Sequence, residues 1–168
     1  MATEHYEVLV AVHARIAALG LRLADNSVLP AAQCRLQKLP FDRKSLTDSG
    51  HGLTLPAVLV TLSEGMEEIG EGSKEHDDIG YPVQVTMAFA SNQNLTLDET
   101  PLRWRKRIRR AFQDKTLAGA NGVEAWDCQV TPQLIISASL FQQANIDVGA
   151  LLIRCWVNED RFERGLNE

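Results

Sequence analysis

Two segments of the chain carry apolar residues at the spacing of an amphipathic helix. The first covers about residues 3–23, and its apolar stripe consists of Leu9, Val12, Ile16 and Leu19. The second begins near Thr100-Pro101, where threonine can cap a helix and proline is tolerated at the first helical position. We expect it to stop before Gly119, and its stripe consists of Trp104, Ile108, Ala111 and Phe112.

Four other segments have the patterns of β-strands. Residues 57–62 form a nearly continuous apolar run, which is typical of a central strand. Residues 83–90 alternate between apolar and less apolar positions, and residues 123–131 and 148–157 are interpreted as two further strands. The order α-β-β-α-β-β predicts an α+β fold: an antiparallel four-stranded sheet with two helices on one face, in a single domain over residues 1–168.

The segments between these elements form two expected arms. Residues 24–55 contain Pro30, Pro40 and the turn-forming run 48–52, which predicts an irregular arm. Residues 63–80 are glycine-rich and acidic and lie between two strands, so we expect a long acidic hairpin arm there.

Composition narrows the class of protein. The chain has 168 residues, a net charge of −5 and an apolar fraction of 45%, which fits one soluble domain without a general affinity for nucleic acid or membranes. Its three cysteines, Cys34, Cys128 and Cys155, form no C-x-x-C pair, so we expect reduced, buried thiols. The sequence has no apolar run of 18 residues and no signal-peptide pattern, which predicts assembly in a cytoplasm.

Catalytic motifs are weak or missing in the sequence. It has no phosphate-binding glycine loop and no G-x-S-x-G elbow. The triplet 76–78 (His-Asp-Asp) and the run 48–51, with its Asp, Ser and His, fall in predicted loops, where converging side chains are not expected. Cys128 has no basic neighbour in sequence that would activate its thiol. We therefore expect no catalytic residue, no metal and no cofactor.

Charge is segregated along the chain, and this is its most distinctive feature. The second helix holds six cations within eight residues: Arg103, Arg105, Lys106, Arg107, Arg109 and Arg110. The hairpin arm holds acidic residues, among them Glu67, Glu68, Glu71, Glu75, Asp77 and Asp78. These can be two unrelated solvated surfaces, a nucleic-acid site on the helix, or complementary surfaces on neighbouring copies of the chain. A head-to-tail contact between different patches can close into a ring.

The order of these elements resembles the tail-terminator (tail-completion) proteins of tailed phages. The likeness rests on the N-terminal helix, the strand start Leu55-Pro56-Ala57-Val58, the hairpin arm, the strand at 81–89, the basic helix and the last strand at 150–154. It covers most of residues 3–158 and is one of architecture. The segment 24–55 is longer than in that family.

The resemblance implies a virion protein of the tail or neck that is assembled in the host cytoplasm. It implies a ring of copies, usually six, which caps the tail tube, joins it to the head-side connector or stopper protein and lets DNA pass through without specific binding. It implies no enzyme activity and no membrane partner. The alternatives are another neck or tail-tube protein, a nucleic-acid-binding module that uses residues 103–110, or a small enzyme.

Overall fold

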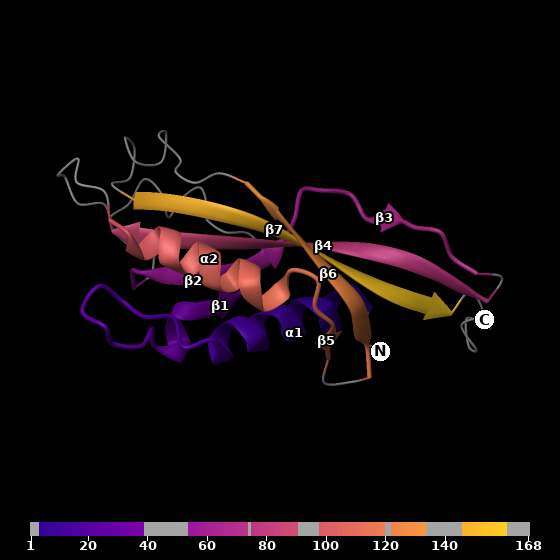
Figure 1. The fold of residues 1–168 in the computed structure, drawn as a ribbon, viewed down its shortest axis with the longest axis horizontal. Coiled ribbons are helices and arrows are strands. Elements are labelled where there is room, and N and C mark those ends of the chain that lie inside the picture. Colours follow the sequence, from indigo (N-terminus) through magenta and orange to yellow (C-terminus); the bar gives the residue numbers. More distant parts are fainter. Residues whose placement is uncertain are drawn as a thin grey trace.

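A computed structural model describes residues 4–38, 54–73, 75–90, 98–119, 122–133 and 146–160 (Figure 1). Two α-helices, α1 (Glu4–Ala18) and α2 (Thr100–Phe112), and a 3-10 turn, η1 (Ala31–Gln33), accompany the strands. The strands are β1 (Cys34–Leu36), β2 (Ala57–Leu62), β3 (Glu68–Ile69), β4 (His76–Ala90), β5 (Leu117–Ala118), β6 (Glu124–Pro132) and β7 (Ile146–Asp160).

The described strands form one mixed sheet in the order β1-β2-β4-β7-β6-β5, and β3 also pairs with β4. β1 runs parallel to β2, and the other pairs are antiparallel. The predicted α+β class is confirmed, but the four-stranded, purely antiparallel sheet is wrong. The additional strands β1, β3 and β5 have two or three residues each, which is too short to produce a period-two pattern in the sequence.

Strand β2 is the inner strand that its apolar run predicts, because it lies between β1 and β4. Val58 and Val60 join the core under the helices, while Leu59, which points to the other face, is also fully buried. β4 and β7 are each 15 residues long and pair along their whole length, so they form the longest strand pair of the sheet.

Both helices pack on one face of the sheet. The core cluster joins the inward face of α1, the stripe of α2 and alternate residues of β4, β6 and β7. Trp104 of α2 is almost completely buried, its ring lies 4.8 Å from that of Phe89, and its indole N–H donates a hydrogen bond of 2.6 Å to the Arg22 carbonyl. Fully burying one large apolar side chain of this kind contributes about 1.5–3 kcal/mol.

The helix ends differ from the sequence prediction. α1 ends at Ala18 rather than near residue 23. Gly20 adopts a left-handed backbone with φ of 58°, a conformation that ends helices and that glycine adopts readily. Thr100 does not cap α2; instead its own N–H donates to the Asp98 carboxylate at 2.8 Å. α2 ends at Phe112, and Asp114 beyond it has φ of 54°.

Of the two expected arms, residues 39–53 lie outside the described residues. The described part of 24–38 contains η1 and β1, and the His13 imidazole lies 3.0 Å from the Cys34 carbonyl oxygen, which ties β1 to α1. The segment 63–80 is part of a hairpin between β2 and β4. β3 continues the pairing beyond β2, and the Ser73 N–H donates to the His76 carbonyl at the turn.

Candidate subunit interface

The acidic arm, residues 63–80, extends along the far half of β4 and β7, away from α2 (Figure 1). Backbone hydrogen bonds at two places along the arm hold it in a hairpin. β3 pairs with residues 79–80 of β4, and the Gly70 N–H donates to the Asp78 carbonyl at 2.7 Å. The acidic residues are therefore carried on a paired β-hairpin with a fixed direction relative to the sheet.

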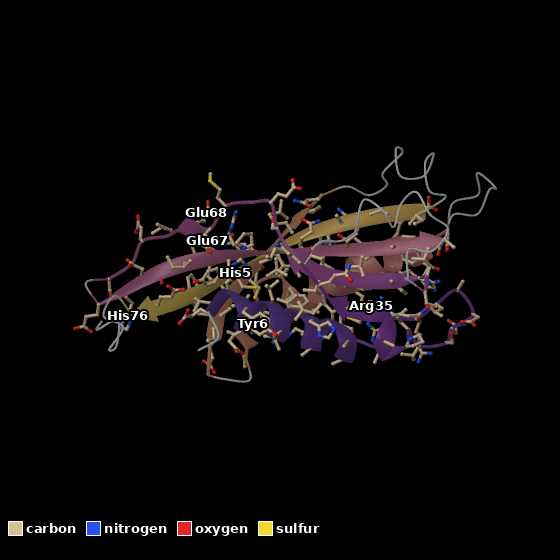
Figure 2. All side chains as sticks on the ribbon, turned by 180° about the vertical axis from the view of Figure 1, so that it is seen from behind. His5, Tyr6, Arg35, Glu67, Glu68 and His76 are labelled. Atoms are coloured by element: carbon tan, nitrogen blue, oxygen red, sulfur yellow. The ribbon has the colours of Figure 1, made fainter. Side chains whose placement is uncertain are left out.

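Two contacts join the root of the arm to the rest of the protein. Glu68 accepts a salt bridge of 2.7 Å from Arg154 of β7, and Glu67 lies 3.5 Å from Nδ1 of His5 in α1 (Figure 2). The His5 ring also stacks on Tyr81 with centroids 4.7 Å apart. Glu67 and Glu68 thus hold the arm in place within the chain.

Trp156 fills the space beneath the arm, and two glycines make that space. A Cβ on Gly80 would lie 3.2 Å from the Trp156 ring, and one on Gly70 would lie 3.0 Å from it. On the other side, the Trp126 ring lies 6.4 Å away and is itself half exposed. The glycines of this segment therefore allow an aromatic side chain to support the hairpin.

The remaining predicted acids of the arm face solvent or are half buried. Glu71 and Glu75 are exposed, and Asp77 and Asp78 are half buried on β4. Between the acids, two large apolar side chains are unusually exposed: Met66 at 85% and Ile69 at 75% of their surface. The arm thus presents both negative charge and apolar surface.

The cations of α2 divide into two groups. Arg103, Lys106, Arg107, Arg109 and Arg110 are exposed, and Arg103 also donates to the Thr100 hydroxyl at 3.3 Å. Arg105 is half buried and donates to two backbone carbonyls, Ala150 at 2.7 Å and Gln133 at 2.8 Å. Burial, and secondarily the charge of Arg109, lowers the pKa of Arg105. Arg105 therefore joins α2 to the sheet, and the other five form the basic surface.

The acidic arm and the basic surface lie over different halves of the long strands. Arg105 contacts Ala150, which pairs with Thr86 of β4, whereas Glu68 of the arm pairs with Gly80. These two positions are six residues apart along β4, which corresponds to about 20 Å at a strand rise of about 3.4 Å per residue. Figure 1 shows α2 over one half of the sheet and β3 beside the other half.

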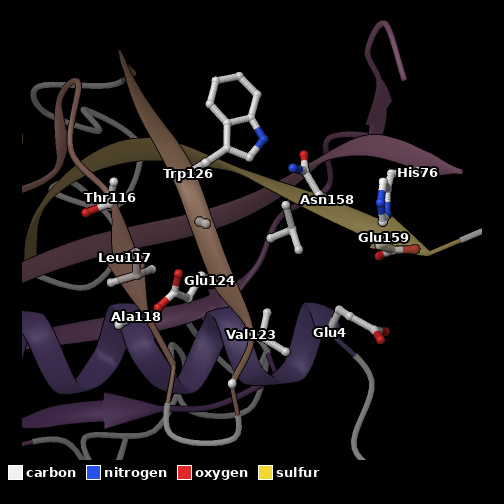
Figure 3. Close-up of a pocket in the computed structure, with 13 residues that line it drawn as sticks. Glu4, His76, Thr116, Leu117, Ala118, Val123, Glu124, Trp126, Asn158 and Glu159 are labelled. Atoms are coloured by element: carbon white, nitrogen blue, oxygen red, sulfur yellow. The ribbon is translucent and has the colours of Figure 1, made fainter. Parts of the chain in front are cut away.

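A hollow of about 1040 Å³ lies beside His76, the first residue of β4 (Figure 3). Residues from the start of α1, from β5 and β6, and from the ends of β4 and β7 line it. Its ionisable lining consists of Glu4, His76, Glu124 and Glu159. Such an acidic lining disfavours anionic ligands.

The candidate chemistries of the sequence gain no support from the described residues. Within the ranges that the structure describes, no group of three or more His, Cys, Asp or Glu side chains is arranged to hold a metal ion, and this includes the triplet 76–78. The Asp-Ser-His run at 48–51 lies outside the described residues. Cys128 is fully buried in the core. No helix among the described residues is long and apolar enough to cross a membrane.

No family model matches the chain, and no match was found among curated proteins. Among solved structures, the chain is similar to a chain described as "Virion of native gene transfer agent (GTA) particle". The two are 13% identical, with a TM-score of 0.42, over 90% of this chain and 95% of the other.

Sequence reasoning missed the residues that hold the arm. Nothing in the sequence separates Arg105 from Lys106 or Arg107, because the distinction is which side of the helix reaches the carbonyl groups of β7 and of the residue after β6. His5 and Arg154 lie 62 or more residues from their acidic partners. A usable signal was the cationic Arg154 within the apolar strand β7, since a charge in such a position needs a partner.

Proposed function

We propose that this protein is a structural subunit of a tailed phage or phage-like particle, a tail terminator that forms a hexameric ring. The ring caps the tail tube and joins it to the head-side connector or stopper protein, and DNA passes through its centre. The subunit performs no catalysis and needs no cofactor. It assembles in the host cytoplasm and becomes part of the tail or neck of the virion.

The observation that carries this proposal is the placement of two opposite charges over different halves of one sheet. An arm that ended beside its own basic helix would neutralise it within the chain. Here the separation of about 20 Å along β4 leaves each surface available to a second copy. Contacts between different patches on identical subunits are head-to-tail, and they close into a ring when the rotation permits.

Charge alone does not hold such a ring together. One exposed ion pair contributes about 0.2–1 kcal/mol, and salt weakens it. Met66 and Ile69 supply apolar surface on the arm, and Leu102, which is 40% exposed, supplies some on α2. In this account the charges set the register of neighbouring subunits, and burial of these apolar side chains provides affinity.

The test exchanges the charges on the two surfaces. We expect the pair of changes Arg107→Glu and Arg110→Glu to reduce ring formation, and Glu71→Arg with Glu75→Arg to reduce it as well. Subunits of the two variants, mixed, should associate again, because each then meets its complement. Lys115→Glu, an exposed change of the same sign just beyond α2, is the matched control.

Light scattering at several concentrations and electron microscopy with isolated tail tubes provide the readout. Rings in solution or on tube ends support the proposal. Monomers at all concentrations, together with bare tube ends, contradict it. Long cylinders formed by the protein alone would instead identify a tail-tube protein.

A second candidate function is nucleic-acid binding through α2, because five cations on that helix are exposed. Such binding falls steeply as salt rises. Retention of DNA at low salt that Arg103→Glu, Arg107→Glu and Arg109→Glu abolish would favour this function. No retention at low salt excludes it.

A further inference from the structure

Cys128 of β6 and Cys155 of β7 are direct neighbours across two antiparallel strands. They are partners in the strand register, and their sulfur atoms lie 3.6 Å apart. Both side chains are fully buried, and both thiols are free in this structure. Cys34, the third cysteine, lies on β1 at the opposite edge of the sheet.

The backbone already satisfies the main requirement for a disulfide. Paired residues of antiparallel strands have Cα atoms about 4.5–5.5 Å apart, and disulfides join Cα atoms separated by about 4.4–6.8 Å. The sulfurs must approach from 3.6 Å to about 2.05 Å, which rotation of the two side chains can supply. A rearrangement of the strands is not required.

We propose that Cys128 and Cys155 are an oxidation site at which a peroxide converts the two thiols into an internal disulfide. One sulfur of the pair attacks one peroxide oxygen, which breaks the O–O bond, gives a sulfenic acid and releases water. The other sulfur then attacks this oxidised sulfur and displaces the sulfenic oxygen as a second water. Two thiols and one hydrogen peroxide therefore yield one disulfide and two waters.

The surroundings distinguish the two sulfurs. The hydrogen bond with Cys155 lowers the pKa of Cys128, burial opposes this, and the charge of Arg15 adds to it. The same hydrogen bond and burial raise the pKa of Cys155. Arg15 is held nearby, since its guanidinium lies over the Phe112 ring at 5.4 Å from the centroid. The charge of Arg15 lowers the pKa of both thiols and so favours a thiolate in this pair.

The bond would join the last two long strands and enclose the segment between them. A cross-link over a loop of this length stabilises a fold mainly by restricting the unfolded chain. We expect the apparent Tm of the oxidised protein to exceed that of the reduced protein by on the order of 5–10 °C. Reduction should reverse the shift.

The test treats the purified full chain with hydrogen peroxide at a dose that converts exposed Met66 to its sulfoxide, which proves delivery of the oxidant. The three cysteines fall on three tryptic peptides, 23–35, 116–154 and 155–161. We expect free thiols, counted after denaturation, to fall from three to one, and peptides 116–154 and 155–161 to appear linked.

Variants separate this pair from other cysteine chemistry. Cys34→Ala should leave the linked peptides unchanged, whereas Cys155→Ala should abolish them. The peptide map of the unmodified protein keeps the test valid if a variant fails to fold. Oxidised Met66 with three remaining thiols, sulfinic acid in place of the link, or a link that involves Cys34 overturns the proposal.

Discussion

The imidazole of His5 and the carboxylate of Glu67 connect the first helix to the acidic arm. The His5 Nδ1 lies 3.5 Å from the Glu67 carboxylate, and Nε2 lies 3.3 Å from the Pro82 carbonyl oxygen. Together with the stacking of His5 on Tyr81, this contact joins α1, the arm and β4 at one point. His5 therefore adds a contact between the arm and the helical layer to the strand pairing and the Glu68–Arg154 salt bridge that also hold the arm.

We expect His5→Ala to loosen the arm without unfolding the protein. Hydrogen exchange at the Gly70 and Ser73 amides, which donate within the hairpin, should become about two- to fivefold faster. Tyr6→Ala is the matched control, because Tyr6 is the exposed neighbour of His5 on α1. A double-mutant cycle with Glu67→Gln isolates the pair itself. Equal exchange rates in all these variants would show that the contact does not hold the arm.

Arg105 should behave as a structural residue among surface cations. Arg105→Ala removes two guanidinium hydrogen bonds, a part-buried one to the Ala150 carbonyl and an exposed one to the Gln133 carbonyl, and a hydrogen bond contributes about 0.5–1.5 kcal/mol. Lys106→Ala changes an exposed neighbour and should alter stability by less than about 0.5 kcal/mol. Denaturant unfolding of the two variants measures this difference. Equal losses of stability would mean that Arg105 belongs to the exposed group.

The raised pKa of Asp147 predicts how the stability of the protein depends on pH. Burial, followed by the negative charge of Asp98, raises the pKa of Asp147 in the folded protein. The folded state therefore binds the proton more tightly, so this residue's contribution to stability is present at low pH and lost as the pH rises through the folded-state pKa. Asp147→Asn should raise the Tm at pH 7 and have little effect near pH 3.

The exposed change Glu124→Gln serves as the control for removal of one negative charge. It should alter the Tm less than Asp147→Asn at pH 7. If Asp147→Asn raises the Tm equally at pH 7 and pH 3, titration of Asp147 is not the cause of the change.

The sequence predicted the parts of the fold that depend on periodicity. The alternation of Val83, Val85, Met87 and Phe89 placed one face of β4 in the core, and the spacing of Trp104, Ile108 and Phe112 identified the buried side of α2. These patterns are long enough to be read because every second or every third to fourth position repeats the same environment.

The rest depended on distant contacts. β1 has three residues with Arg35 in the middle, so only its parallel pairing with β2 makes it a strand. The arm was predicted from its glycines and acids, but the side chain that approaches Gly70 most closely is Trp156, which lies 86 residues further along the chain. A glycine pattern cannot indicate which aromatic ring it accommodates. The same holds for Arg105, whose partners are carbonyl groups on other elements.

The most direct test of the account is a zero-length carbodiimide cross-link between the acidic arm and α2 in a mixture of isotopically light and heavy protein. Lys106 supplies an exposed amine within the basic surface, and Glu71 and Glu75 supply exposed carboxylates on the arm. Head-to-tail contact between subunits should give linked peptides that join Lys106 to the arm and combine one light with one heavy partner. Links only between partners of the same isotope, or none between Lys106 and residues 64–78, would contradict it.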